Sequence, residues 1–198
     1  MKKDIAFFDF DGTITTKDTM LEFAKYCHSA ANYWFGMALI LPWLIGMKMG
    51  LVSKQKAKEK FITYFFGNIS LEKFNEDCNL FTTEVIPHLI KADALQTIKK
   101  FQSENTEVVI VSASAESWVA PWCGQQNISF LCTKLEVKEN KISGKLLGQN
   151  CNGLEKVNRI KQQYDTASYE NIYCYGDTDG DKPMLGLATE PHYRLFLR

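Results

Sequence analysis

Two carboxylates separated by one residue, Asp9 and Asp11, follow a short apolar run at residues 5–8. Side chains two apart on an extended chain share a face, so a strand that continues through this run aims both carboxylates the same way. Two like charges held together are unfavourable unless a cation or a proton lies between them. Gly12 then permits a sharp turn and a close backbone approach. The segment indicates either a divalent-metal site with carboxylate chemistry or a strand end capped by solvated acids.

Ser112 and Lys156 are two further residues whose types suit phosphate chemistry. Ser112 ends the run Val-Val-Ile-Val-Ser, and Ala113 and Ser114 follow it. A hydroxyl group beside successive backbone N–H groups at a helix start forms a phosphate site. Lys156 lies near the start of a predicted helix, where a positive charge opposes the helix dipole and so indicates a nearby anion. The ordinary alternatives are a serine at a strand end and an exposed surface lysine.

Three acids gather in the segment Gly-Asp-Thr-Asp-Gly-Asp, which follows an apolar run at residues 172–175. They are Asp177, Asp179 and Asp181. The pattern lacks the full ligand set and the terminal Glu of an EF-hand loop, which disfavours calcium. A few hard oxygen ligands, with water completing the shell, suit Mg²⁺. The segment therefore predicts a magnesium site, with a solvated turn as the alternative.

Three short apolar runs must position these residues, because each is typical of a buried strand and ends close to them. Small or polar residues follow each run, as expected for parallel strands that gather ligands at their carboxyl ends. Helical patterns alternate with the runs along most of the chain. The sequence therefore predicts an α/β fold with a parallel sheet, whose strands span residues 5–10, 108–112 and 172–175.

About a hundred residues separate the first two predicted strands, far more than one crossover helix requires. Asp18 or Thr19 can cap the first helix of this segment, and Pro87 suits the first turn of the last. We expect an all-helical insertion at residues 15–85 and a core domain formed by residues 1–14 and 86–198. The expected helices span residues 18–28, 53–66, 70–83 and 87–103, and a β-hairpin is expected at residues 134–137 and 141–147.

An uncharged apolar stretch begins at Tyr33 and ends at Met47. As a helix it would reach ~22 Å, short of the ~30 Å hydrocarbon core of a bilayer, and Pro42 would kink it. A single membrane span is therefore not expected. The stretch is either a buried helical hairpin or a contact with a bilayer surface, which its aromatic residues and the lysines after it would suit. These residues are Tyr33, Trp34, Trp43, Lys48, Lys54, Lys56, Lys58 and Lys60.

The composition limits which binding partners and which cellular compartment we expect. The 198 residues include 23 basic and 23 acidic side chains, and a net charge of zero argues against a nucleic-acid partner. Six scattered cysteines, with no C-x-x-C, fit neither a zinc site nor a small disulfide scaffold. Acidic residues interrupt the apolar start, so no cleavable signal is expected. We expect a cytoplasmic protein, at the inner face of the membrane if the apolar stretch contacts lipid.

The motifs taken together indicate a protein family far more specifically than any single motif does. D-x-D-G-T at residues 9–13, a strand ending in Ser112, Lys156, and G-D-x-x-x-D at residues 176–181 occur in this order. This pattern resembles the haloacid dehalogenase superfamily of phosphohydrolases along the whole chain. The insertion after the first motif is similar to the cap of the subclass that includes phosphoserine phosphatases. The resemblance implies a Rossmann-like parallel-sheet core with an α-helical C1-type cap after the first strand.

The resemblance also implies an aspartyl-phosphate mechanism. Asp9 would be the nucleophile that attacks phosphorus, and Asp11 the general acid that protonates the leaving alcohol and then activates water. Lys156 would stabilise the charge of the nucleophile and of the phosphoryl group. Mg²⁺ would be bound by Asp9, the backbone carbonyl of Asp11, Asp177 and, directly or through water, Asp181.

The remaining positions that the resemblance assigns contact the phosphate or the substrate. Asp179 is additional to the motif pattern and is not expected to be a ligand. A complete motif set also disfavours a non-enzymatic lipid-binding scaffold. The residues expected to bind phosphate or substrate are Gly12, Thr13, Asp18, Ser112, Ala113 and Lys156.

The substrate is the least determined feature. Phosphoserine phosphatases bind their substrate through a glutamate of the cap and an arginine. Here Asp18 corresponds roughly to the position of that glutamate, and no arginine precedes Arg159. The apolar cap is instead similar to that of phosphatidylglycerophosphatase-C-like members. We expect a Mg²⁺-dependent phosphomonoester hydrolase acting on a lipid-linked or amphiphilic phosphate. A phosphatase of soluble small metabolites and a phosphotransferase are the alternatives.

Overall fold

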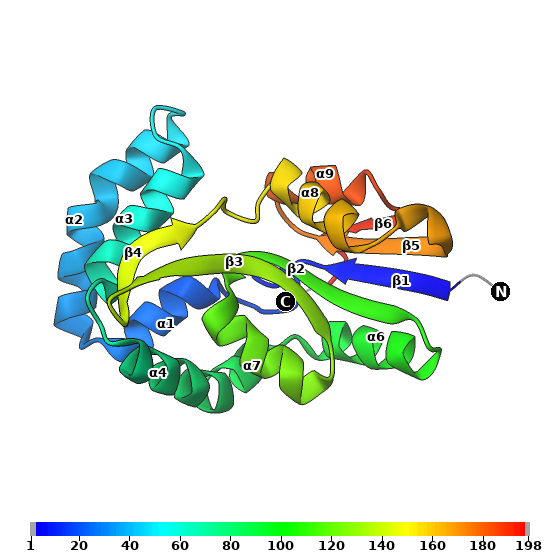
Figure 1. The fold of residues 1–198 in the computed structure, drawn as a ribbon, viewed down its shortest axis with the longest axis horizontal. Coiled ribbons are helices and arrows are strands. Elements are labelled where there is room, and N and C mark those ends of the chain that lie inside the picture. Colours follow the sequence, from blue (N-terminus) through cyan, green and yellow to red (C-terminus); the bar gives the residue numbers. More distant parts are fainter. Residues whose placement is uncertain (1–2, 197–198) are drawn as a thin grey trace.

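The computed structural model describes residues 3–196, which fold around a six-stranded sheet (Figure 1). The strands lie in the order β4-β3-β2-β1-β5-β6. Neighbours run parallel except β3 and β4, which form an antiparallel hairpin. The predicted α/β fold with a parallel core sheet is confirmed. The strands are β1 (Lys3–Phe8), β2 (Glu107–Ala115), β3 (Ser129–Lys138), β4 (Lys141–Leu147), β5 (Tyr169–Gly176) and β6 (Glu190–Tyr193).

Side chains along the inner strands alternate between two hydrophobic clusters, one on each face of the sheet. In β1, Ile5 and Phe7 belong to one cluster, and Ala6 and Phe8 belong to the other. Helices α8 and α9 cover the first face, and α6 and α7 cover the second (Figure 1). Because both faces are buried, the strands are continuous apolar runs. These helices are α6 (Ala92–Ser103), α7 (Glu116–Gln126), α8 (Leu154–Gln163) and α9 (Lys182–Leu185), and the short helices η1 (Thr166–Ser168) and η2 (Asp179–Asp181) flank β5.

Six helices lie between β1 and β2, and the first four lie where the sequence predicts a helical insertion. The residue before each of these four helices is a Ser or an Asp, whose side chain accepts a hydrogen bond from a backbone N–H of the first helical turn. Their aromatic side chains join the cluster on the second sheet face, where the rings of Phe23 and Trp118 lie 5.2 Å apart. The insertion and the sheet therefore share one cluster. The helices are α1 (Thr19–Cys27), α2 (Ala30–Lys48), α3 (Lys54–Phe66) and α4 (Leu71–Glu84).

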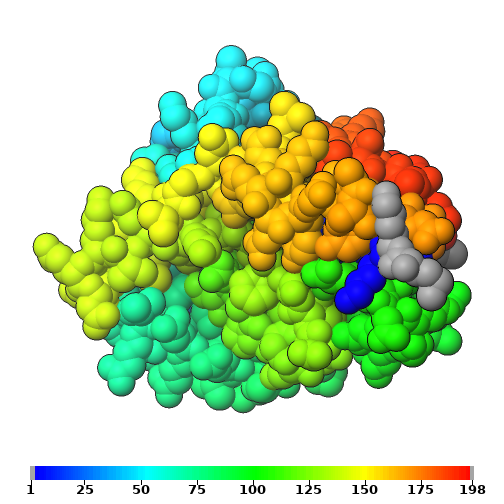
Figure 2. Space-filling model, turned by 45° about the vertical axis from the view of Figure 1, so that its right-hand side comes forward, coloured from blue at the N-terminus to red at the C-terminus, as the bar shows by residue number. Residues whose placement is uncertain are grey.

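Helix α2 contacts the rest of the molecule along one side only. Its buried residues are Tyr33, Gly36 and Ile40, which face α3. At Gly36 the helices approach so closely that a Cβ atom would lie 2.7 Å from the Phe65 ring. The stretch from Tyr33 to Met47 is therefore part of one helix with a single buried side, and it is not the buried helical hairpin that was one of the two alternatives. In the space-filling view its tip projects from the top of the molecule, coloured cyan (Figure 2).

Helix α3 also lies against β4 of the hairpin (Figure 1). Thr63 donates a hydrogen bond to the Gly144 carbonyl at 3.1 Å. The turn after α3 continues this contact with backbone hydrogen bonds, from Asn68 N to Ile142 O at 2.8 Å and from Ile142 N to Ile69 O at 2.9 Å. The insertion is thus joined to the hairpin by backbone and side-chain bonds.

The prediction of a single helix at residues 87–103 is wrong, because the chain forms two helices there, α5 (Ile86–Leu89) and α6, with an extended break between them. Ile90 is extended there and forms a bridge with Thr15, and Lys91 N donates to Ile14 O at 2.8 Å. The segment that returns from the insertion pairs in this way with the segment that enters it. A helix through Ile90 would forfeit that pairing.

Candidate active site

Four segments that are distant in the sequence meet at the carboxyl ends of β1, β2 and β5. Asp9 follows β1, Ser112 lies in β2, Asp177 follows β5 and Lys156 is in the first turn of α8. They border a cavity of about 310 Å³. Every predicted site residue lines it except Thr13, which donates a hydrogen bond to Asp177 Oδ1 at 3.2 Å. The predicted residues that line it are Asp9, Asp11, Gly12, Asp18, Ser112, Ala113, Lys156, Asp177 and Asp181.

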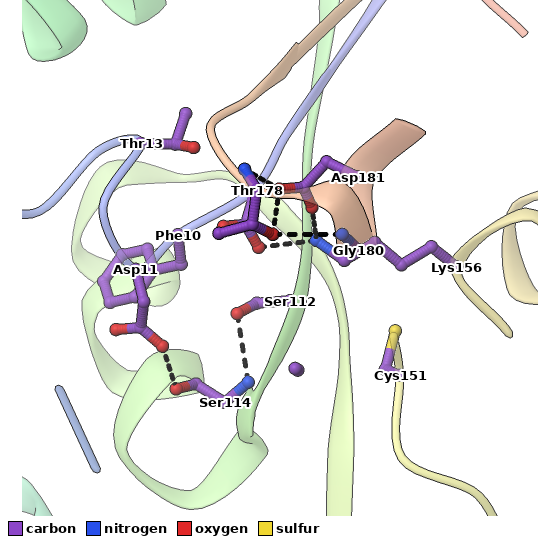
Figure 3. A network of polar contacts seen from close by, with 12 residues as sticks. Phe10, Asp11, Thr13, Ser112, Ser114, Cys151, Lys156, Thr178, Gly180 and Asp181 are labelled. Atoms are coloured by element: carbon purple, nitrogen blue, oxygen red, sulfur yellow. Dashed lines mark hydrogen bonds and ion pairs between the residues drawn. The ribbon is translucent and has the colours of Figure 1, made fainter. Parts of the chain in front are cut away.

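The buried ammonium group of Lys156 joins two carboxylates. Its Nζ lies 2.5 Å from Asp9 Oδ1 and 2.7 Å from Asp181 Oδ1, and its side chain is 1% exposed (Figure 3). Burial acts to lower the pKa of Lys156, but the charges of the two aspartates outweigh it and raise that pKa above its usual value. The lysine therefore stays protonated and holds both carboxylates in place.

Asp9, Asp177 and Asp181 form a carboxylate cluster that fits a magnesium ion. One oxygen of each lies within 4.8 Å of the others. Burial raises the pKa of Asp9 to about 7 and also raises that of Asp177, so the cluster needs more positive charge than Lys156 supplies to stay ionised. Mg²⁺ binds hard oxygens at ~2.1 Å, which places opposite ligands ~4.2 Å apart. The donor types and their spacing match these demands.

The other oxygen of Asp181 is held by the loop after β5. Asp181 Oδ2 accepts hydrogen bonds from Thr178 N at 3.0 Å and from Thr178 Oγ1 at 2.9 Å (Figure 3). Burial acts to raise the pKa of Asp181, but the Lys156 charge and these bonds lower it below its usual value. Asp179, by contrast, is exposed and pairs with Lys182 at 2.8 Å, so it lies outside the cluster.

Gly12 sits where no side chain fits. Its φ is +78°, a left-handed conformation that glycine adopts readily, and a Cβ atom would lie 2.9 Å from Asp177 Cγ. A side chain would push Asp177 away from the cluster. The glycine of the first motif therefore allows the loop after β1 to approach the aspartate after β5.

The carboxylate of Asp11 points to the helical insertion instead of the metal cluster. Its Oδ1 accepts hydrogen bonds from Thr19 N at 2.8 Å and Thr19 Oγ1 at 2.7 Å, and its Oδ2 accepts one from Ser114 Oγ. Figure 3 shows it turned toward Ser114 and away from Lys156 and Asp181. Burial raises the pKa of Asp11 to about 6. A carboxyl group that titrates near neutral pH can both donate and accept a proton in one catalytic cycle.

Sequence reasoning missed the residues that hold Asp11. Thr19 begins α1, and Ser114 lies at the end of β2, two residues after Ser112. Trp118 of α7 donates from Nε1 to Thr19 Oγ1 at 3.1 Å, which orients that hydroxyl group. The repeated serines after the second strand were the only local signal, because a threonine at a helix start is ordinary.

Lys58 was also missed as a site residue. It lies on α3, and its Nζ donates hydrogen bonds to the Ala113 carbonyl and, at 3.3 Å, to Asn150 Oδ1. Burial lowers the pKa of Lys58, with Asp11 and Asp18 as the acids that oppose this shift most. The lysine run in the sequence suggests a solvated or lipid-facing helix side, so nothing local indicated that one lysine turns toward the cavity.

Asp18 lines the cavity and also caps α1. Its Oδ1 accepts a hydrogen bond from Leu21 N at 3.0 Å, as expected for a helix cap. The carboxylate is thereby fixed at the entrance to the insertion. It borders the cavity but does not belong to the carboxylate cluster.

The sequence profile of the haloacid dehalogenase-like hydrolases matches residues 6–186. The chain is 31% identical over 191 residues to protein CicA of Caulobacter vibrioides, covering 96% of this chain and 85% of that one. It is 23% identical over 217 residues to a histidinol-phosphatase of Neisseria meningitidis, covering 96% and 89%. The chain belongs to the haloacid dehalogenase-like hydrolase family and is an enzyme, as the motif pattern predicts.

Solved structures share the fold. A protein of unknown function from Bordetella pertussis superposes with a TM-score of 0.84 at 17% identity, covering 96% of this chain and 88% of that chain. A phosphoserine phosphatase, solved as an analogue of its phospho-aspartyl intermediate, superposes with a TM-score of 0.69 at 18% identity, covering 95% and 84%. The predicted likeness to the phosphoserine phosphatase fold is confirmed.

Proposed function

We propose that the protein hydrolyses phosphomonoesters in a Mg²⁺-dependent reaction through an aspartyl-phosphate on Asp9. The observation that carries the proposal is the contact of Lys156 with Asp9 at 2.5 Å beside the cluster of Asp9, Asp177 and Asp181. The lysine offsets charge on the nucleophile and on the transferred group. When bound, Mg²⁺ neutralises charge on the phosphoryl oxygens and on the aspartates that hold it.

In the first step, an oxygen of Asp9 forms a bond to phosphorus as the bond from phosphorus to the leaving oxygen breaks. Asp11 donates its proton to that oxygen, which departs as an alcohol. Ser112 and the backbone N–H of Ala113 bind the phosphoryl oxygens, while the N–H of Ser114 donates to Ser112 Oγ at 3.0 Å. In the second step, Asp11 takes a proton from water, water oxygen bonds to phosphorus, and the bond to Asp9 breaks. Inorganic phosphate leaves, and both aspartates return to their starting states.

We further propose that residues 15–85 act as a cap domain over a core of residues 1–14 and 86–198. Helix α1 supplies the Thr19 bonds to Asp11, and α3 supplies Lys58 beside Ala113. Both contacts bring groups of the insertion to the edge of the cavity. A cap in this position selects the leaving group, because it covers the side of the site where that group departs.

The proposed substrate is a lipid-linked or otherwise amphiphilic phosphomonoester. The exposed apolar side of α2 supports this choice, as does the lack of an arginine before Arg159 to grip a small carboxylate. The alternative is a soluble metabolite, which the relative named histidinol-phosphatase favours. We propose a cytoplasmic location with either kind of substrate. With an amphiphilic substrate, the enzyme would act at the inner face of the membrane.

The catalytic proposal is tested with an aryl phosphate, Mg²⁺ and two aspartate variants. Asp9→Asn should lower kcat about a thousandfold or more, because the nucleophile is lost. Asp179→Asn is the matched control, since Asp179 is exposed outside the cluster, and it should retain activity. Chelation should abolish turnover and added Mg²⁺ restore it, and a rapid quench should leave a phosphoryl adduct on the peptide that contains Asp9. Undiminished turnover by Asp9→Asn would refute the mechanism.

A substrate panel then separates the leaving groups. We expect a higher kcat/KM for phosphatidylglycerophosphate in mixed micelles than for phosphoserine, histidinol phosphate or sugar phosphates. A preference for one of the soluble esters would assign the protein to metabolite hydrolysis. Phosphate transfer to an added alcohol in place of water would assign it to phosphotransfer.

A further inference from the structure

The outer side of α2 is an exposed apolar surface. Trp34 is 65% exposed, Phe35 64%, Leu39 52%, Ile45 50% and, just past the helix, Met49 68%. These residues lie on the side of the helix opposite Tyr33, Gly36 and Ile40, which face α3. Soluble monomers rarely leave so many large apolar side chains together in water. We call this surface the α2 face: Trp34, Phe35, Leu39, Leu41, Ile45, Met49 and Leu51.

The geometry of α2 favours a helix lying along a surface over one crossing it. Among the described residues, α2 is the one helix long and apolar enough to span a membrane by length and composition. Its inner side, however, packs on α3, where Gly36 fits against Tyr64 and Phe65. A spanning helix would have to leave this contact and expose the aromatic rings of α3. Lying in the plane of an interface keeps the contact and buries the α2 face.

The segment of the sequence that contains α2 carries positive charges only. No acidic residue lies between Glu22 and Glu59, whereas Lys48, Lys54 and Lys56 are exposed at and just beyond the end of α2. The ammonium group of Lys60 also lies 4.8 Å from the centre of the Trp43 ring, which keeps that cation beside α2. Lysines beside an aromatic apolar surface complement a negatively charged lipid headgroup layer.

We propose that the α2 face docks the protein on the surface of a bilayer that contains anionic lipid. The aromatic and aliphatic side chains enter the boundary between headgroups and acyl chains, and the lysines at the end of α2 contact the headgroups. Helix α3 links this surface to the cavity, because it packs on α2 through Phe65 and reaches Ala113 through Lys58. This docking does not depend on hydrolysis. It rests on the proposed function only in the choice of substrate, because an amphiphilic substrate requires contact with a bilayer and the α2 face provides that contact.

The test is co-sedimentation of the full chain with vesicles of phosphatidylcholine, with and without phosphatidylglycerol. Binding to the anionic vesicles should exceed binding to the neutral ones and weaken as salt is raised. The double variant Trp34→Ser with Phe35→Ser should bind about tenfold more weakly or worse, because two large side chains lose their burial in lipid. Tyr193→Ser is the matched control, an exposed aromatic residue on β6 at the opposite edge of the sheet, and it should bind like the parent.

Tryptophan emission gives a second readout. Trp34 and Trp43 of α2 are exposed while Trp118 and Trp122 are buried, so a blue shift on adding anionic vesicles reports α2 alone. Trp34→Phe should reduce the shift and keep the binding. Absence of vesicle binding at low salt would overturn the proposal, as would binding that the double variant does not weaken. A stable dimer that hides Trp34 from a soluble quencher without lipid would also overturn it, since the occupant would then be a second copy.

Activity on a soluble aryl phosphate separates this inference from the proposed catalysis. The α2 variants should hydrolyse that substrate at the parental rate, because the α2 face contributes nothing to the cavity. A parent protein that hydrolyses the aryl phosphate but does not bind anionic vesicles would count against docking alone. A parent protein that binds the vesicles but does not hydrolyse the aryl phosphate would count against the catalytic proposal alone.

Discussion

At the scale of single residues, the two aspartates of the first motif differ in what surrounds them. Asp9 lies 2.5 Å from the Lys156 ammonium group, whereas Asp11 accepts neutral hydrogen bonds from Thr19 and Ser114. Burial raises the pKa of Asp9 to about 7 despite this partner, so a nucleophile that must stay deprotonated here needs the charge of a bound cation besides that of Lys156. Neutral donors leave a carboxyl group free to exchange its proton near neutral pH. The two proposed roles therefore match the neighbours of each group.

The hydrogen bond from Ser114 to Asp11 gives a prediction at this scale. Ser114→Ala should lower kcat about tenfold for an alkyl phosphate, because a bond to a charged group contributes roughly 1.5–3 kcal/mol and its loss leaves the acid less well aimed. With p-nitrophenyl phosphate the loss should be much smaller, since that leaving group departs without a proton. The measurement is kcat for both substrates in both proteins. An equal loss for the two would show that Ser114 supports the fold and not the proton transfer.

Residues whose role depends on one local segment were predictable from the sequence. Asp9, Ser112 and Asp177 each follow or end an apolar run, and parallel strands bring such ends together. Thr19 and Lys58 were not predictable in this way, because their roles depend on how the insertion packs over the core. Thr19 looks like an ordinary helix start, and Lys58 looks like its neighbours in a lysine run.

At the scale of elements, the contact between α3 and β4 is unusually close. Gly144 has a φ of +85°, and a Cβ atom on it would lie 2.6 Å from Thr63 Cα. Glu59 adds a bond from Leu146 N at 3.3 Å on the same side of α3. Lys58 precedes Glu59 on α3, so the contact helps to set the position of that lysine beside the cavity.

Gly144→Ala should therefore lower the free energy of unfolding by about 1–3 kcal/mol, because the new methyl group strains the backbone and separates α3 from β4. Gly148→Ala is the matched control. Gly148 has a similar φ of +83° but nothing within 4 Å of the added Cβ atom, so it reports the backbone strain alone. Urea denaturation of the three proteins measures the difference. Equal destabilisation by the two alanines would show that the close approach contributes nothing.

Most elements were predictable because their hydrophobic period or their caps are local. Helices α1, α3 and α4 lie within a residue of their expected ends, since Asp18, Ser53 and Ser70 cap them. Helix α7 and strand β6 were not foreseen: α7 contains Pro121 and is apolar without a clear period, and β6 has four residues. The break at Ile90 was missed because a bridge to Thr15, distant in the sequence, decides it.

At the scale of the whole molecule, the insertion and the core do not have separate hydrophobic interiors. Phe23, Phe66 and Phe81 of the insertion share one cluster with Phe8 of the sheet and Trp118 of α7. The sequence predicts the insertion between two strands, but it could not show this sharing, because aromatic residues of both parts look alike in a linear pattern. The insertion therefore cannot move over the cavity as an independent domain, because any such movement has to preserve the packed interior that it shares with the core.

A shared interior predicts that the insertion and the core unfold together. Calorimetry should show one transition whose van't Hoff and calorimetric enthalpies agree. Phe23→Ala, which removes a buried ring from the insertion, should destabilise the whole chain by about 3–5 kcal/mol and keep the transition single. Had the insertion its own interior, the same substitution would split the transition and leave the core at its original Tm. Amide exchange gives the same distinction residue by residue: protection of β1 and β2 should fall together with that of α1 when Phe23 is truncated, because one cooperative unit has one free energy of opening.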